Sequence, residues 1–435
     1  MRLLENRLTR PQGGLTVAFA ALSALSIAFI AHACRTYRAL GLHRLHRAPH
    51  VELETLVRGL GNGTLLWALF QAAFLGSMVL MSISCIVVTA SAFDALSLLL
   101  LGNAWGVQLS PSLEWVSSCA QRGGCEGQPA FEAVSNAGGK IVSLGYALTV
   151  AMTAPLALLD VSDAFQMVSY VLSLACMLQL IFKFTAIAMA QEGGGAQVMP
   201  PAFGWANSGL ALEVSFWSWC ISFAGPLWVE EKDVSTPLAK PLILAFGHRV
   251  VLDLMLGLSG AAAFPNMPAT TLNILDAVAV HPACGVLTRA CGIGFVVSSL
   301  AANIVDYAMV ASRNLESHLG VTAANMLGIG LPFASGWLFF FGESFASLVN
   351  AASPLLNGMV QFVVPALLFL AYSRMDSDAG AHSSSLKVLG MSLKESTWRL
   401  CALLIALVIS LLILLTYVLN ARGHIHPMGS ADYAN

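Results

Sequence analysis

A long run of uncharged residues limits how this chain can fold. No charged side chain occurs between Thr64 and Phe93. As an α-helix rising 1.5 Å per residue, these roughly thirty residues would measure about 45 Å, more than the roughly 30 Å hydrocarbon core of a bilayer. Charged residues make up only 10% of the chain and hydrophobic residues 57%, whereas about 25% of residues in soluble proteins are charged. The sequence therefore predicts a membrane protein in which this helix is tilted or overshoots the bilayer.

Similar apolar runs recur along the whole chain, so we expect an all-α, multi-pass protein with a single transmembrane domain over residues 1–435. The ten predicted spans are 14–34, 64–97, 141–159, 166–190, 208–230, 242–264, 284–311, 321–341, 345–372 and 400–419. A cleaved signal peptide is the alternative for the first, since Ala31-His32-Ala33 has the small-x-small form, although the run is long for a signal. With the first loop in the cytoplasm, most Lys and Arg residues lie on the inner side, as the positive-inside rule requires. That orientation places Arg2, Arg7 and Arg10 outside.

The span 208–230 is interrupted by small and helix-breaking residues. Ser218 and Ser222 are followed by Gly225-Pro226. Proline has no N–H group and glycine is unfavourable within a helix, so the span is expected to break. Within the membrane, backbone N–H and C=O groups released from helical hydrogen bonds are tolerated only where protein buries them or where they line a cavity. There they can bind a solute or an ion. A continuous helix kinked at Pro226, with serines bonded to their own carbonyls, is the alternative.

Several local patterns occur in one order along most of the chain. They are Cys34 to Arg38 with Glu54 to Gly61; Ser215 to Cys220 with Pro226 and Glu230; Gly260 to Phe264 with Asn273, Leu275, Pro282, Leu287 and Cys291; Arg313 and Glu316; and Pro332 with Leu348 to Leu370. Taken together, they resemble the amino acid/auxin permease family of amino acid transporters, within the APC superfamily.

This resemblance implies a LeuT-like fold of two inverted repeats, in which the first helix of each repeat is broken around the substrate. Family members have eleven helices, whereas ten are predicted here, and the family's first helix has no counterpart. We expect that the sequence starts too late, rather than that the protein works without that helix.

The resemblance also implies where solute binds. The family's broken sixth helix holds solute through backbone and small side chains, and the matching residues are Ser215, Ser218, Trp219, Cys220, Ile221 and Ser222. An amino acid carries a carboxylate and an ammonium, which half-helix N-termini and exposed carbonyls can satisfy without buried counter-charges. Trp217 and Trp219 are expected to act as gates or walls, or else to face lipid or neighbouring side chains.

The sequence is compatible with either H⁺ or Na⁺ as the coupling ion. Sodium-coupled members of the family have a hydroxyl residue at the position that matches Ile304, so Na⁺ would need another ligand, for which Asn303 is the candidate. Carboxylates inside spans are costly and usually functional, which makes Asp306 the preferred proton site. Glu213 and Asp253 are further candidates, with Lys183 and Arg289 as partners in proton binding or in structural ion pairs.

No motif for catalysis, metal binding or a resident cofactor occurs, and the net charge of −2 gives no indication of nucleic acid binding. Cys119 and Cys125 could form a disulfide if their loop is external. The predicted function is secondary active transport of amino acids by alternating access, with the amino acid and the lipid bilayer as partners, in the plasma membrane or a vacuolar or lysosomal membrane. The alternatives are a non-transporting amino acid sensor or membrane scaffold, and a truncated product without function.

Overall fold

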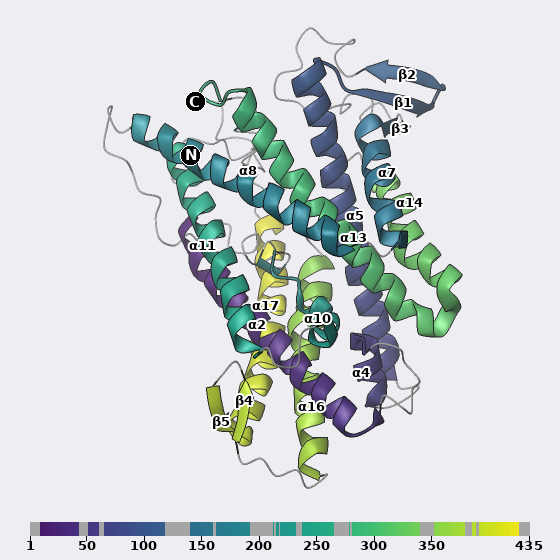
Figure 1. Ribbon diagram of the computed structural model, residues 1–435, viewed down its shortest axis with the longest axis vertical. Helices are drawn as coiled ribbons and strands as arrows, with labels where there is room; N and C mark the ends of the chain where they lie inside the picture. Colours follow the sequence, from purple (N-terminus) through teal and green to yellow (C-terminus); the bar gives the residue numbers. More distant parts are fainter. Residues whose placement is uncertain are drawn as a thin grey trace. The chain divides into compact units, whose positions relative to one another are not determined.

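The computed structural model describes most of the chain. The described residues are 9–42, 51–60, 65–117, 140–159, 162–191, 212, 215–216, 218–231, 237–264, 278, 281–339, 352–378, 385–388 and 391–425. Within them the chain is mainly helical and carries two small β-sheets (Figure 1).

Eight helices among the described residues are long and apolar enough to cross a membrane. They comprise Gly14–Ala39, Trp67–Leu101, Ala164–Gln191, Ala239–Ala263, Val286–Glu316, His318–Leu338, Ala352–Asp376 and Glu395–Val418. The chain is therefore a multi-pass, mainly helical membrane protein. Of the predicted spans without such a helix, 141–159 contains the shorter apolar helix α7 (Leu144–Leu159), and 208–230 contains a broken segment.

The chain divides into two compact units. One unit consists of Met1–Asn6, Met78–Met199 and Leu252–Val349, and the other of Arg7–Ser77, Pro200–Val251 and Asn350–Asn435. Two helices, α5 (Leu65–Leu101) and α11 (Ala239–Ala263), continue from one unit into the other.

In the first unit, α13 (Val286–Asn325) packs along α8 (Ser162–Gln191) and against α7. Gly320 interrupts α13 with φ of 76°, a left-handed conformation that glycine adopts without steric cost. Beyond it, the π-helix η3 (Met326–Gly330) packs against α13 and leads into α14 (Leu331–Phe339). A Cβ on Gly328 would lie 2.5 Å from the backbone nitrogen of Ser312, so this close approach requires glycine.

The same unit carries a three-stranded antiparallel sheet in the order β2-β1-β3, formed by β1 (Trp105–Ser110), β2 (Glu114–Ser117) and β3 (Lys140–Ser143). Ala104, Val116 and Ile141 form its small buried core, and Leu98 at the end of α5 packs against them. The sequence analysis missed this sheet because its strands are short and lie beside a polar loop. The mainly helical class is nevertheless confirmed.

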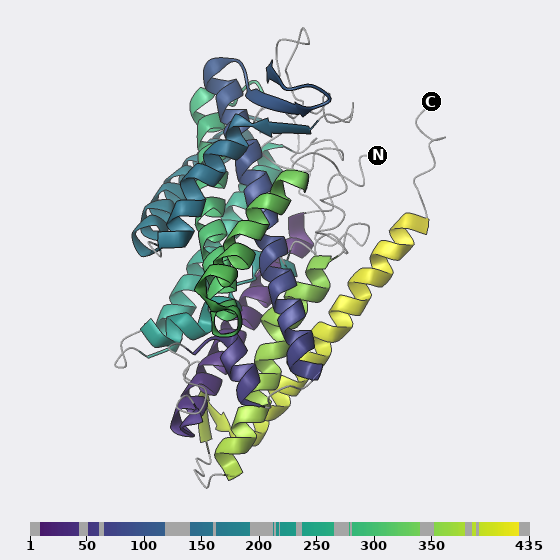
Figure 2. The ribbon, with the colours of Figure 1, turned by 90° about the vertical axis from the view of Figure 1, so that its right-hand side faces the viewer.

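The second unit is built on α2 (Thr9–Ala39), α16 (Val364–Asp378) and α17 (Glu395–Ile425). Helix α16 packs against both α2 and α17, and Figure 2 shows α16 and α17 running alongside each other. The π-helix η4 (Met359–Val363) precedes α16 and contacts α2 and α17. The short helix α4 (Leu53–Gly59) packs on α2, and the hairpin of β4 (Ser385–Val388) and β5 (Met391–Lys394) adjoins α17.

Aromatic side chains fill the core of this second unit. The Phe19 ring makes edge-to-face contacts with Phe216 and Phe362, at centroid distances of 5.0 and 5.6 Å. Phe29 stacks on Phe369 at 4.5 Å. Edge-to-face and offset-stacked rings attract one another beyond the area they bury. These contacts join α2 to α16, to η4 and to the broken segment that contains Phe216.

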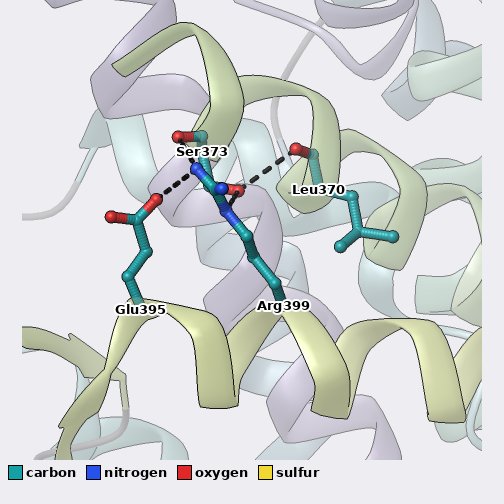
Figure 3. A network of polar contacts seen from close by, with 4 residues as sticks. All are labelled: Leu370, Ser373, Glu395 and Arg399. Carbon is teal, nitrogen blue, oxygen red and sulfur yellow. Dashed lines mark hydrogen bonds and ion pairs between the residues drawn. The ribbon is translucent and has the colours of Figure 1, made fainter. Parts of the chain in front are cut away.

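Polar contacts join α16 to α17 at the start of α17 (Figure 3). The Arg399 guanidinium donates from Nη2 to the Ser373 carbonyl oxygen at 2.6 Å and from Nε to the Ser373 hydroxyl at 3.1 Å. Arg399 also pairs with Glu395, one turn earlier in α17, at 2.5 Å. The Ser373 hydroxyl donates to the Leu370 carbonyl at 3.1 Å. One arginine thus ties two adjacent membrane-spanning helices together.

Candidate functional site

The predicted break in span 208–230 is present. Ser215, Phe216 and Ser218 are helical, whereas the backbone leaves the helix at Cys220 and Ile221, where Ile221 has φ of −130° and ψ of −3°. The chain then forms the 3-10 turn η2 (Ser222–Ala224) and helix α10 (Gly225–Glu231). Pro226 is the second residue of α10, where its missing N–H is not needed. The interruption therefore precedes Pro226, which rules out the alternative of a continuous helix kinked there.

The break is fixed by Gln361, a residue that the sequence analysis did not identify. The Ser222 backbone N–H donates to Gln361 Oε1 at 2.6 Å. Ser222 Oγ lies 2.9 Å from the Gln361 carbonyl oxygen and 2.5 Å from Oε1, so its single proton is shared between these acceptors. Both residues are almost fully buried, at 1% and 0% exposure. The start of the second half-helix is thus bonded to the π-helical turn η4.

The Gln361 side chain has hydrogen-bonding capacity left over. Because a backbone N–H can only donate, the atom facing Ser222 must be the amide oxygen, and the amide cannot be flipped. The Nε2 atom is then left with two donor hydrogens. It is buried and has no hydrogen-bond partner in the described part of the chain. A buried donor of this kind is costly unless something else binds it.

The other half of the break is held by α2 and α11. Ser23 of α2 donates from Oγ to the Trp219 carbonyl oxygen at 3.0 Å. The Trp219 ring stacks on Phe246 of α11 at a centroid distance of 5.8 Å, and the Arg249 guanidinium lies 5.6 Å from the Trp219 centroid. Cation–π attraction favours this arrangement. Trp219 is 3% exposed and packs on these neighbouring side chains, so it does not face lipid, and its role as a gate or wall stays a prediction.

Gln361 belongs to a buried polar stripe. Ser353, Asn357 and Gln361 follow one another at intervals of four residues, which places them on one helix face. Asn357 donates to Ser353 Oγ at 2.8 Å and accepts from Ser77 of α5 at 2.6 Å. This spacing inside an apolar span was the sequence signal for Gln361. The signal was missed because each residue alone is an ordinary neutral polar side chain.

The sequence-predicted substrate residues fall on both sides of the break. Ser215, Trp219, Cys220 and Ser222 are buried and Ser218 is partly buried, whereas Ile221 is 36% exposed. Cys220 and Ile221 form the interruption itself, Trp219 and Ser222 flank it, and Ser215 lies on the preceding helical part. Glu213 and Trp217 lie outside the described residues.

The candidate coupling residues belong to the first unit. Asn303 and Asp306 are both partly buried and lie three residues apart on α13, so they share a helix face. The Asp306 carboxylate accepts a short hydrogen bond from Gln166 Nε2 of α8. Ile304 is fully buried. Arg289, considered as a partner for these carboxylates, has a buried Nε atom without a hydrogen-bond partner among the described residues.

No cluster of His, Cys, Asp or Glu side chains suited to a metal ion occurs in the described ranges. The described cysteines form no disulfide with one another. Cys119 and Cys125 lie outside the described residues, so their expected pairing stays a prediction.

Chemically, the break presents neutral hydrogen-bonding groups in a mostly apolar setting. Ser222, Gln361 and Ser23 supply donors and acceptors, while Trp219 and Phe216 supply apolar surface. Such a combination suits a small polar solute better than a bare ion or a lipid tail. Neither the protein-family models nor the curated proteins with which the chain was compared match it.

Proposed function

We propose that this protein is a secondary active transporter of amino acids that works by alternating access. One observation carries the proposal: the segment of 208–230 is interrupted at Cys220 and Ile221, and Ser222 beside the interruption is bonded to Gln361, whose Nε2 donor has no partner among the described residues. Interrupted membrane helices are a recurring means of building solute and ion sites in secondary transporters.

The chemistry of the break supports an amino acid as the solute. A zwitterion carries equal and opposite charges, so it can be held by hydrogen bonds and peptide dipoles without a buried counter-ion. Carbonyl groups released from helical bonding accept from the ammonium, and N–H groups donate to the carboxylate. Trp219 and Phe216 provide apolar surface for a side chain. The resemblance to amino acid/auxin permeases points to the same class of solute.

The driving ion is proposed to be H⁺ or Na⁺, with Asp306 and Asn303 as the coupling residues. Asp306 already accepts a hydrogen bond from Gln166, and its protonation would remove an acceptor between α13 and α8. Asn303, on the same face, offers an amide oxygen, a ligand type that suits a hard cation.

Gradient-driven uptake tests this proposal. The full-length chain is reconstituted into vesicles, and uptake of radiolabelled alanine, leucine, glutamine and lysine is measured under an imposed proton gradient or an imposed sodium gradient. We expect saturable uptake of at least one amino acid under one of the two gradients. No uptake of any of the four by folded protein under either gradient would contradict the proposal.

A further inference from the structure

We propose that the Nε2 group of Gln361 is the hydrogen-bond donor that holds the carboxylate of the transported solute. This inference rests on the proposed function and adds to it the residue and atom that select for an acidic group. Gln361 lies on the span 345–372, outside the residues that the family resemblance assigned to solute binding.

The direction of the amide is set by the protein itself. Gln361 Oε1 accepts from the Ser222 N–H at 2.6 Å and lies 2.5 Å from Ser222 Oγ. These contacts fix the side chain and leave Nε2 turned away from Ser222. The donor is therefore already in place before a solute arrives, which reduces the entropy lost on binding.

The position of the amide also indicates a ligand. Nε2 is buried and has no partner among the described residues, at a place where η4 contacts the η2 turn of the broken segment. Gln361 lies within a π-helical turn, a rare feature that is frequent at functional sites. A purely structural glutamine would need only the oxygen that caps Ser222, whereas this one presents two further donor hydrogens.

A carboxylate is the acceptor that fits best. Its oxygens accept hydrogen bonds from neutral donors more strongly than a carbonyl or hydroxyl does, because the acceptor is ionised. A buried water is the competing occupant, since it too can satisfy an isolated donor. The two occupants differ in their effect on solute affinity, and only the carboxylate makes that affinity depend on the donor.

Two substitutions separate the role of the Nε2 donor from that of the Oε1 oxygen that caps the Ser222 N–H. Gln361→Glu keeps an oxygen facing the Ser222 N–H but, when ionised, has no donor. Gln361→Met removes both the donor and the cap at similar volume. Gln179→Met is the matched control, because Gln179 is a partly buried glutamine of α8, and Gln179 and its partner Thr288 both belong to the unit that does not contain Gln361.

The measurement is equilibrium binding of tritiated alanine, leucine, glutamine and lysine to the purified full-length chain. It is made in the presence of Na⁺ at about pH 6, where a coupling proton is available, and at about pH 9, where ionisation of the introduced carboxyl group is favoured. We expect both Gln361 variants to raise the Kd of the bound amino acid about tenfold or more, because a hydrogen bond to a charged group is lost. Gln179→Met should keep the Kd of the unmodified protein.

Different outcomes overturn different claims. If Gln361→Glu binds as the unmodified protein does and Gln361→Met loses only thermal stability, Gln361 is a structural cap and this inference is wrong, while the proposed function stands. If the unmodified protein binds none of the four amino acids, both the inference and the proposed function are overturned.

Discussion

Ser222 donates its backbone N–H to the side-chain oxygen of Gln361 at 2.6 Å, and its hydroxyl lies 2.9 Å from the Gln361 carbonyl oxygen. This double contact joins the interrupted segment of 208–230 to the π-helical turn of the membrane-spanning helix Ala352–Asp376. Both residues are buried, so neither can replace its partner with bulk water. Loss of both contacts is therefore expected to alter the geometry of the break.

The first prediction concerns the Ser222 hydroxyl. Ser222→Ala removes the hydroxyl contact but keeps the backbone N–H that Gln361 caps. We expect a loss of about 1 kcal/mol in stability, the usual net value of one hydrogen bond, with binding of amino acid retained. Thermal unfolding in detergent and binding measured on the same sample check both parts. Loss of binding at unchanged stability would show that the hydroxyl itself contacts solute.

The second prediction concerns the cation above Trp219. Arg249→Lys keeps a cation over the ring, whereas Arg249→Met keeps a long side chain without charge. We expect Arg249→Met to cost about 0.5–1 kcal/mol in stability and Arg249→Lys to cost less. Unfolding of the two variants, followed by tryptophan fluorescence, measures the difference. Equal losses in the two would mean that the planar guanidinium, and not the charge, is what matters at this position.

The third prediction concerns two helical glycines of the first unit. Gly328→Ala would place a Cβ 2.5 Å from the Ser312 nitrogen, which is backbone and cannot move aside easily. Gly257→Ala meets nothing within 4 Å and removes an unfavourable glycine from α11. We expect Gly328→Ala to lower the melting temperature. Gly257→Ala should leave the melting temperature unchanged or raise it, with a gain of up to about 1 kcal/mol in the free energy of unfolding. An equal effect at both positions would contradict the close packing of η3 on α13.

The fourth prediction concerns Arg399. Arg399→Met removes its two hydrogen bonds to Ser373, and we expect a loss of about 1.5–3 kcal/mol in stability, the range for bonds to charged groups. Glu395→Gln removes only the ion pair, which is about 30% exposed and solvent-screened, so it should cost less than about 1 kcal/mol. Comparing the unfolding of the two variants checks this order. The reverse order would show that the ion pair dominates the junction of α16 and α17.

The fifth prediction concerns Asp306. If proton binding there drives uptake, Asp306→Asn should abolish uptake driven by a proton gradient but leave exchange of internal for external amino acid intact. Gradient-driven uptake and exchange are both measured on the same vesicles. Glu114→Gln, which changes an exposed carboxylate of β2 outside the predicted spans, is the control and should retain both activities. Gradient-driven uptake that survives Asp306→Asn would remove Asp306 from the coupling mechanism.

The sequence was informative where local composition determines the structure. Long uncharged runs such as 64–93 require a membrane environment whatever they pack against, so the membrane class followed directly. The break near Ser222 was also predictable, because small residues and Gly225-Pro226 lower helix stability locally. Its position relative to Pro226 was ambiguous until the structure placed Pro226 within the first turn of α10.

The partner of the break was not predictable in the same way. Gln361 lies 139 residues from Ser222 along the chain, and nothing in either local sequence specifies that they meet. The stripe of Ser353, Asn357 and Gln361 signals a polar helix face but not what that face contacts. The strands β1 to β3 were missed for a related reason, since their pairing joins short segments across a long loop.

Counterflow tests the central claim most directly, because it reports solute passage without requiring an imposed gradient of the coupling ion. Vesicles containing the protein are loaded with unlabelled amino acid, diluted into labelled amino acid, and followed for transient accumulation of label. The account predicts accumulation with the unmodified protein and with Ser410→Trp, an exposed serine of α17, but none with Ser222→Trp, which fills the break. Absence of accumulation in all three, or equal accumulation in Ser222→Trp, would contradict transport through this site.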